Sequence, residues 1–160
     1  MKGIDLQVDI PASPFYADVD EEILTKMLSN LMSNALKHAS QKIKVSLLPG
    51  SDRFKVSISN DGDTIPAKYA DKIFLPFFRI DVKAQGSGIG LPFARSLAEL
   101  HKGTLTLERS NTQLTTFVIE LPVTQSHVFV IPSAAQETSS LVTAQSHNPA
   151  IEEEMDLHNR

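Results

Sequence analysis

Residues 42–59 read KIKVSLLPGSDRFKVSIS, and two runs within them, 42–48 and 53–59, alternate apolar and polar side chains. Strict alternation over this length predicts half-buried strands. The Pro-Gly-Ser-Asp sequence between the runs is typical of a turn, so the strands are expected to form a hairpin. Strands that follow one another without an intervening helix favour a mixed or antiparallel sheet, with helices on one face, over a doubly wound sheet.

The segment before this hairpin predicts one strand and one long helix. Residues 4–10 (IDLQVDI) alternate like a strand, and Asp18 or Asp20 is a plausible N-cap for a helix that extends to Ala39. Apolar residues recur through this helix at helical spacing, at Leu24, Met27, Leu28, Leu31, Ala35 and Leu36.

The segment after the hairpin predicts two more helices and a second hairpin. Pro66 suits the first turn of a short helix, and Gly103 is expected as the C′ residue that ends the last helix. The expected elements, in chain order, are a short helix over 66–73, a mobile loop over 80–88, a helix from Leu91 to His101, and strands over 104–109 and 114–121.

Composition narrows the class of protein. The chain has 160 residues, 41% hydrophobic and 21% charged, which is close to the globular average and suits one domain with a tail. It has no cysteine, which excludes disulfide scaffolds, thiolate zinc sites and cysteine nucleophiles. No apolar run approaches the roughly 20 residues of a membrane helix, and the N-terminus does not resemble a secretion signal. The cytosol is therefore the expected compartment.

The charge is concentrated at the C-terminal end. The formal net charge is −4, and residues 123–160 hold five acids and one base, which leaves 14 of each in residues 1–122. Residues 1–122 are expected to be the folded domain and residues 123–160 a largely disordered linker, in which VFVI (128–131) could add an edge strand. A neutral domain lacks a broad positive surface, so neither a nucleic acid partner nor direct membrane contact is expected.

The first helix carries a polar edge with possible chemistry. At 100° per residue, Asn30, Asn34, Lys37 and His38 fall within an arc of roughly 100°, beside the apolar stripe. Amide oxygens are hard ligands that suit Mg²⁺, and lysine supplies a point charge for phosphate. Taken alone, the same side chains could form an ordinary solvated face.

Three later motifs are equally ambiguous when each is taken alone. NDGDTIP (60–66) follows a strand and could be a binding turn or an ordinary one, and FLPFFR (74–79) is expected to be core packing apart from Arg79. GSGIGL (86–91) opens a helix, and its glycines would let backbone N–H groups approach an anion, or it could be a flexible hinge. Its spacing matches neither the dinucleotide fingerprint nor a Walker A loop.

Together and in this order, the four motifs resemble a known set. Asn-x-x-x-Asn-Ala-x-Lys-His, N-D-G-x-x-I-P, F-x-P-F-F-R and G-x-G-x-G-L resemble the N, G1, F and G2 boxes of histidine kinase catalytic domains, which belong to the GHKL ATPases. The resemblance covers about residues 4–121. It implies the Bergerat fold, an α+β two-layer sandwich with a mixed sheet of about five strands and about three helices on one face.

The resemblance also implies roles for particular residues, with ATP and Mg²⁺ as cofactors. Asn34 matches the metal ligand, and Lys37 matches a phosphate-binding lysine. Arg79 and Lys83 flank a loop like the ATP lid, where their charge could neutralise the γ-phosphate. The further nucleotide contacts that it implies are His38, Asn60, Gly62, Ile65, Gly86, Gly88, Ile89, Gly90 and Leu91.

Three positions depart from the pattern or bear on the mechanism. Asn60 stands where the family has the acid that accepts the adenine amino proton, and its amide oxygen can still accept that bond. Thr64 replaces the second G1 glycine. ATP-hydrolysing relatives have a Glu base at the position of Asn30, and a carboxamide cannot act as a base near neutral pH. The site is therefore expected to hold ATP without activating water.

The function implied by the resemblance is transfer of the ATP γ-phosphoryl group to a histidine. None of the five histidines is followed by an acid, so the acceptor is expected on a dimerisation domain of the same parent protein, before residue 1, with a response regulator receiver domain as the next partner. Membrane attachment of the parent stays open. The alternatives are a degenerate nucleotide-binding module that signals by protein contacts and a serine kinase of the anti-sigma type.

Overall fold

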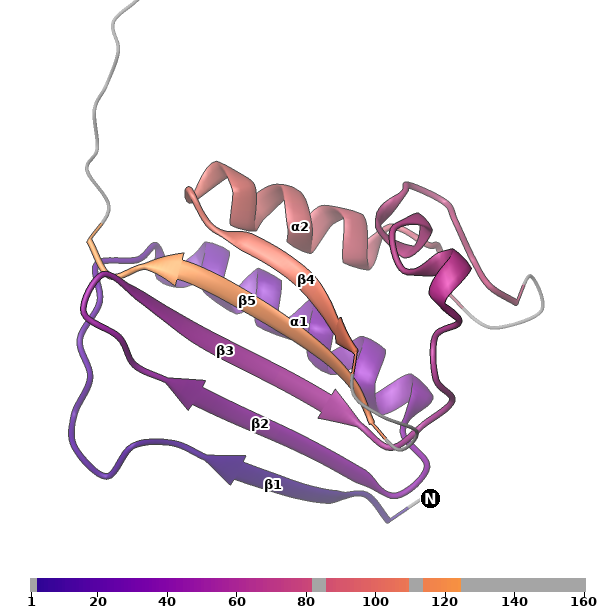
Figure 1. Cartoon of the computed structure of the whole chain (residues 1–160), viewed down its shortest axis with the longest axis horizontal. Coiled ribbons are helices and arrows are strands. Elements are labelled where there is room, and N and C mark those ends of the chain that lie inside the picture. Colours follow the sequence, from indigo (N-terminus) through magenta and orange to yellow (C-terminus); the bar gives the residue numbers. More distant parts are fainter. Residues whose placement is uncertain (1–2, 82–85, 110–113, 125–160) are drawn as a thin grey trace, which may run out of the picture. The chain divides into compact units, whose positions relative to one another are not determined.

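The computed structural model describes residues 3–81, 86–109 and 114–124 (Figure 1). All of them lie within one compact unit, residues 1–125. The predicted linker therefore lies outside the described residues almost entirely, as does its possible strand at 128–131, and the domain boundary stays a prediction. Among the described residues no helix has the length and apolar character of a membrane span.

The elements follow the predicted order. The strands are β1 Asp5–Asp9, β2 Lys42–Leu48, β3 Arg53–Asn60, β4 Thr104–Arg109 and β5 Thr115–Pro122, and the α-helices are α1 Glu21–His38 and α2 Gly90–Leu100. The sheet has the order β1-β2-β3-β5-β4, with β1 parallel to β2 and the other pairs antiparallel. Both α-helices lie on one face of it (Figure 1). The predicted α+β class with a mixed five-stranded sheet is confirmed.

Helix α1 begins and packs for local reasons. The side chain of Asp20 accepts a hydrogen bond from the backbone N–H of Ile23 at 3.0 Å, as expected of an N-cap. Acidic side chains lie in the first turn and basic ones in the last, which suits the helix dipole. Met27, Leu31 and Ala35, spaced four apart, are buried against the sheet. This packing fixes which edge of α1 remains available for a site.

The core continues along β3 and β5 in rows of facing residues. Phe54 pairs with Leu121, Val56 with Ile119 and Ile58 with Phe117, and all six side chains are buried on the helix side. The next pair along the same face is Asn60 with Thr115, which is also buried but polar. The sheet thus presents a polar pair at the end where β3 leads toward the start of α2 (Figure 1).

The C-terminal end of α2 differs from the prediction that Gly103 is its C′ residue. The residue with the left-handed backbone is Lys102, with φ of 54°, so Lys102 and not Gly103 is C′. The N–H of Gly103 donates to the carbonyl of Ala98 at 2.8 Å, and that of Lys102 to the carbonyl of Glu99 at 3.0 Å. This pair of bonds is a Schellman motif, in which glycine is C″. The prediction was displaced by one residue because a lysine adopts the backbone conformation that usually selects glycine.

The segment between β3 and α2 also differs from its predicted structure. The predicted short helix over 66–73 forms two 3-10 turns, η1 Ala67–Tyr69 and η2 Lys72–Phe74. Phe74 packs edge-on against Phe117 and Phe78 packs against Tyr69, as core packing requires. Phe77 is 73% exposed, and Leu75 and Pro76 are exposed as well, so the expectation of core packing is wrong for these three residues. The backbone of Phe77 has a φ of 63°, in the left-handed region that few residues with side chains adopt.

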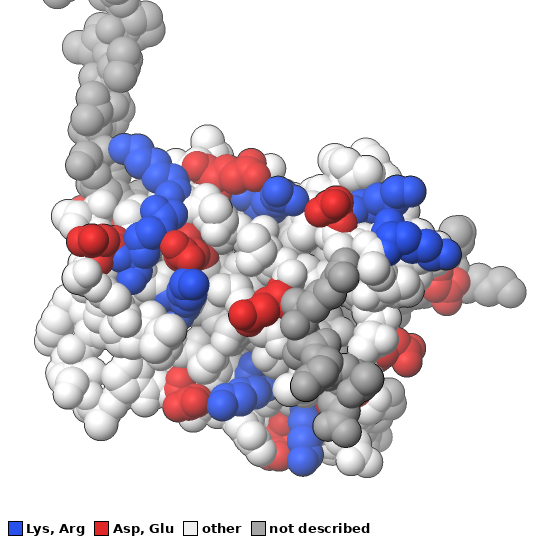
Figure 2. Space-filling view, in the orientation of Figure 1, with Lys and Arg blue, Asp and Glu red and all other residues white. Residues whose placement is uncertain are grey.

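Acidic and basic side chains are interspersed over the face of the molecule shown in Figure 2. Ion pairs join neighbouring strands, including Lys44 with Asp9 at 3.1 Å and Arg53 with Glu120 at 2.8 Å. No broad region of a single sign is present on this face. The expectation that the domain has no nucleic acid partner stays a prediction.

Candidate functional site

A single cleft of about 1160 Å³ brings most of the predicted site residues together. It is lined by α1, the end of β3, the following loop, the end of the FLPFFR segment, the glycine loop and the start of α2. The predicted residues that line it are Asn30, Asn34, Lys37, His38, Asn60, Ile65, Arg79, Gly86, Gly88, Ile89, Gly90 and Leu91. Gly62 is not among the lining residues, and Lys83 lies outside the described residues.

Helix α1 contributes the polar edge that its spacing predicted. Asn30 donates from Nδ2 to the carbonyl of Lys26 at 2.8 Å, and its Oδ1 is directed at Gly90, 3.0 Å from where a Cβ there would lie. Nζ of Lys37 lies 2.7 Å from the equivalent position at Gly86. These contacts place the amide edge of α1 directly against the glycine loop and the start of α2.

The glycine loop and the start of α2 form the opposite wall. Gly86 and Gly88 have φ of 138° and 71°, which side-chain-bearing residues rarely adopt. The N-cap of α2 is Ile89, whose side chain makes no capping bond, so the first N–H groups of the helix have no side-chain acceptor. Such a helix start favours a bound anion, especially with an ammonium group nearby.

The cations of the cleft are not neutralised by ion pairs. Neither Lys37 nor Arg79 makes an ion pair with any acidic side chain in the described part of the chain. Two acids, Asp63 and Asp81, also line the cleft. Burial lowers the pKa of His38 below its ordinary 6.5, Lys37 lowers it further, and Asp63 opposes the shift. The imidazole is therefore neutral at physiological pH and can pack on an aromatic ring.

Asn60 is the most unusual group in the cleft. Its side chain is 1% exposed, and its Nδ2 is the one buried side-chain nitrogen or oxygen atom in the described residues that lacks a hydrogen-bond partner. Native structures rarely leave such a donor unsatisfied, so an acceptor from outside the chain, a ligand atom or an ordered water, is expected at this position. The adjacent turn is held close by Gly62, where a Cβ would overlap the carbonyl oxygen of His38. Gly62 thus shapes the site without lining it.

Sequence reasoning missed two residues that shape this end of the sheet. The carboxylate of Asp61 accepts backbone hydrogen bonds from Ser40, Gln41 and Lys42 at 2.9 to 3.1 Å, which ties the end of β3 to the α1–β2 connection. The bonds from Lys42 and Gln41 are the main causes that lower the pKa of Asp61 below 3.8. Thr115 lines the cleft opposite Asn60, and its hydroxyl donates to the carbonyl of Asp63 at 3.3 Å.

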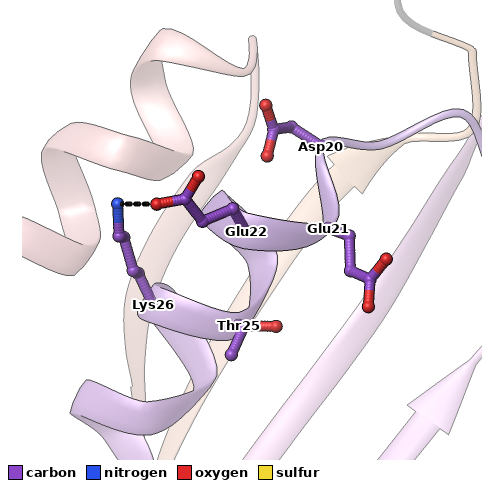
Figure 3. Close-up of a pocket in the computed structure, with 5 residues that line it drawn as sticks. All are labelled: Asp20, Glu21, Glu22, Thr25 and Lys26. Atoms are coloured by element: carbon purple, nitrogen blue, oxygen red, sulfur yellow. Dashed lines mark hydrogen bonds and ion pairs between the residues drawn. The ribbon is translucent and has the colours of Figure 1, made fainter.

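A second hollow lies at the start of α1 (Figure 3). Its lining residues are Asp20, Glu21, Glu22, Thr25 and Lys26. The only basic group among them is paired, because Lys26 contacts Glu22 at 2.6 Å. Three carboxylates around one neutralised ammonium would repel a phosphate, so this hollow is not the candidate site.

Comparison with known proteins identifies the family of this chain. Residues 19–125 match the family described as histidine kinase-, DNA gyrase B-, and HSP90-like ATPase. The chain is 33% identical over 115 residues to the probable sensor kinase SilS of Salmonella typhimurium, covering 68% of this chain and 23% of SilS. It is 31% identical over 123 residues to the heme sensor protein HssS of Staphylococcus aureus, covering 76% of this chain and 26% of HssS. The chain thus spans about a quarter of the length of these relatives.

Solved structures show the same fold. The catalytic domain of the histidine kinase ThkA, in a nucleotide-free form, superimposes with a TM-score of 0.68 at 28% identity, covering 76% of this chain and 81% of that one. Full-length ShkA in complex with AMPPNP superimposes with a TM-score of 0.69 at 23% identity, covering 78% of this chain and 27% of ShkA. At that lower identity, the likeness to ShkA concerns the fold alone.

Proposed function

Because this chain belongs to the family of histidine kinase-, DNA gyrase B- and HSP90-like ATPases, we propose that it is the ATP-binding catalytic domain of a two-component sensor histidine kinase. In this proposal it transfers the γ-phosphoryl group of ATP to a histidine on a separate dimerisation domain of the same parent protein. The names of its relatives, a sensor kinase and a heme sensor, support a sensory parent. A response regulator receiver domain would accept the phosphoryl group next.

The observation that carries the proposal is the composition of the cleft. A buried amide without a partner lies at one end, and a lysine, an arginine and an uncapped helix start lie around the rest. Ile65, Ile73 and Leu91 supply apolar surface for a purine ring. A neutral His38 adds a ring that can pack on the nucleotide. These groups fit a purine nucleoside triphosphate in both its apolar and its anionic parts.

Catalysis in this proposal is positioning and electrostatic stabilisation. Asn34 offers an amide oxygen to Mg²⁺, which when bound offsets charge on the phosphate oxygens. Lys37 and the N–H groups at the start of α2 hold the phosphates, and Arg79 and Lys83 offset the charge that develops during transfer. Asn30 donates its amide to the backbone of its own helix and has no basic group to activate water. The cleft therefore retains ATP until an acceptor histidine arrives.

The localisation proposed for this fragment is the cytoplasm, where ATP is available, and the parent protein could be anchored in a membrane. Neither nucleic acid nor lipid is proposed as a partner of the domain itself.

The test of the metal assignment is Asn34→Ala. We expect ATP affinity measured by calorimetry in Mg²⁺ to fall by roughly 10- to 100-fold, because an amide ligand is lost, while affinity in EDTA stays near that of the wild type. Ser29→Ala, at an exposed position on the same helix, is the matched control and should match the wild type in both buffers. Equal affinity of Asn34→Ala and wild type in Mg²⁺ would refute the assignment.

Transfer is tested separately with the dimerisation domain encoded by the parent gene. Incubation with radiolabelled ATP should produce an acid-labile, base-stable phosphohistidine on that domain. ATP binding without any transfer would instead favour a module that signals by contacts alone, and label on a serine would favour the serine kinase alternative.

A further inference from the structure

The feature of the cleft that its proposed function leaves unexplained is the unpartnered amide of Asn60. Asn60 ends β3 on the helix side of the sheet, pairs with Thr115 across the strands, and lines the cleft. The hydroxyl of Thr115 donates to the carbonyl of Asp63, and no group in the described residues accepts a hydrogen bond from Nδ2 of Asn60. A buried donor of this kind persists only where something that binds there can satisfy it.

A carboxamide and a carboxylate recognise different purines. A carboxylate only accepts hydrogen bonds, so at this position it pairs with the amino group of a 6-aminopurine and repels a carbonyl oxygen. A carboxamide both accepts and donates, and rotation of its terminal torsion exchanges the two atoms within one side-chain shape. An asparagine is therefore not restricted to one of the two purine classes.

Exchange of Oδ1 and Nδ2 of Asn60 is enough to match the hydrogen-bonding edge of either purine class. Adenine presents a donor at N6 beside an acceptor at N1, whereas a 6-oxopurine presents an acceptor at O6 beside a donor at N1. Asn60 can meet the first edge with Oδ1 on the amino group and Nδ2 on N1. After rotation it can meet the second with Nδ2 on O6 and Oδ1 on N1–H. Both arrangements satisfy the atom that the structure leaves unpaired.

We infer that the cleft accepts 6-oxopurine nucleoside triphosphates as well as ATP, and that Asn60 is the residue that permits it. The inference rests on the proposed nucleotide site and adds its base selectivity. Thr64 and Asp63, which follow in the same turn, are exposed and line the same cleft.

The experiment compares ATP, ITP and GTP as competitors of a fluorescent ATP analogue, on the whole chain in Mg²⁺. For the wild type we expect the dissociation constant of ITP or GTP to lie within about 10-fold of that of ATP, since a bidentate pair is available to each. ITP isolates the 6-oxo group, and GTP adds a 2-amino group. A preference for ATP of 100-fold or more over both would overturn the inference, and this comparison needs no variant.

Asn60→Asp should restore discrimination. The carboxylate keeps its bond to the adenine amino group but loses the bond to N1, whereas with a 6-oxopurine it faces O6 with a negative charge. We therefore expect binding of ITP and GTP to fall by about 100-fold or more, and binding of ATP to fall much less, so that the ratio of ATP to ITP affinity rises. Gln7→Glu makes the same amide-to-carboxylate change on β1, away from the cleft. It should change neither the ratio of ATP to ITP affinity nor the ratio of ATP to GTP affinity. Unchanged ITP binding in a folded Asn60→Asp variant would show that another group reads the base.

The outcomes separate this inference from the proposed function. If ATP binds and both 6-oxopurine nucleotides are rejected, the ATP-binding function stands and the inference is wrong, with a bound water as the partner of Nδ2. If none of the three nucleotides binds, the proposed function is itself refuted, and the inference fails with it.

Discussion

Two stretches of the same pair of strands differ in chemistry although their geometry is continuous. Along most of β3 and β5 the residues that face the helices are apolar, and the rows end with Ile58 opposite Phe117. In the next row, Asn60 faces Thr115, equally buried but polar. The apolar side chains of the first stretch are satisfied by packing against other residues of the protein. The last row leaves a donor unpaired and therefore depends on something that the protein does not contain.

This difference indicates how the domain divides stability from binding. The apolar rows gain stability from area removed from water and from packing with α1 and α2. The polar row contributes less to stability, because burying a polar group without a hydrogen-bond partner costs free energy, but it presents hydrogen-bonding groups at the cleft. A change in the apolar rows should therefore alter unfolding with little effect on nucleotide selectivity, and a change in the polar row should do the reverse.

The largest effect is expected in the apolar rows, from Phe117→Ala. Phe117 is 2% exposed and packs edge-on against Phe74 at 6.3 Å, so its removal leaves a cavity at the centre of the core. We expect the free energy of unfolding, measured by urea titration, to fall by about 3–5 kcal/mol. At temperatures where the variant remains folded, its ratio of ITP to ATP affinity should match the wild type. A changed ratio would mean that the core row and the polar row are energetically coupled.

A smaller effect of opposite sign is expected in the polar row, from Asn60→Leu. Leucine has a similar size and removes the unpaired buried donor, so the free energy of unfolding should rise by about 1 kcal/mol while nucleotide binding is lost. Thr115→Val is the matched control, because it removes a hydroxyl that does have a partner, and it should lower stability slightly. A loss of stability in Asn60→Leu would indicate that the amide already has a partner, such as a bound water.

Much of this architecture is predictable from local sequence. The hairpin over 42–59, the long helix with its Asp20 cap and the closing strands all follow from periodicity, because alternation and helical spacing directly record which face is buried. The helical spacing of Asn30, Asn34, Lys37 and His38 likewise predicted that they share one edge of α1, and all four line the cleft. Local patterns were less informative between β3 and α2, where neither period is present and short 3-10 turns replace the predicted helix.

What the sequence could not supply are contacts between distant segments. Thr115 was missed because its place in the cleft depends on the pairing of β5 with β3, and Asp61 because its three backbone partners lie about 20 residues earlier in the chain. Phe77 looks like a core residue in any hydrophobicity pattern. Only its backbone conformation, stabilised by an N–H donated to the carbonyl of Gly88 at 3.0 Å, exposes it.

Asp61 directly follows Asn60 but differs from it in hydrogen bonding, because its side chain has partners within the protein. Its carboxylate is fully engaged with the backbone N–H groups of Lys42, Gln41 and Ser40, and these bonds lower its pKa below 3.8 in the folded chain. On acidification the unfolded chain therefore takes up this proton first. The stability that Asp61 contributes is complete at neutral pH and is lost as the pH falls below 3.8 and through the folded pKa.

The smallest of the predicted effects is therefore a pH-dependent one, from Asp61→Asn. Because this carboxylate is exposed to solvent, its contribution is screened, and only a modest decrease in the urea midpoint is expected at pH 7. The difference from the wild type should shrink progressively as the pH falls below 3.8 and through the lowered pKa of the folded chain, because the wild-type carboxylate then becomes protonated itself. Asp71→Asn removes an exposed carboxylate that makes no capping bond, and as the matched control its urea midpoint at pH 7 should equal that of the wild type. A difference that stays constant across this range would mean that the bonds to Asp61 act through geometry alone and not through its charge.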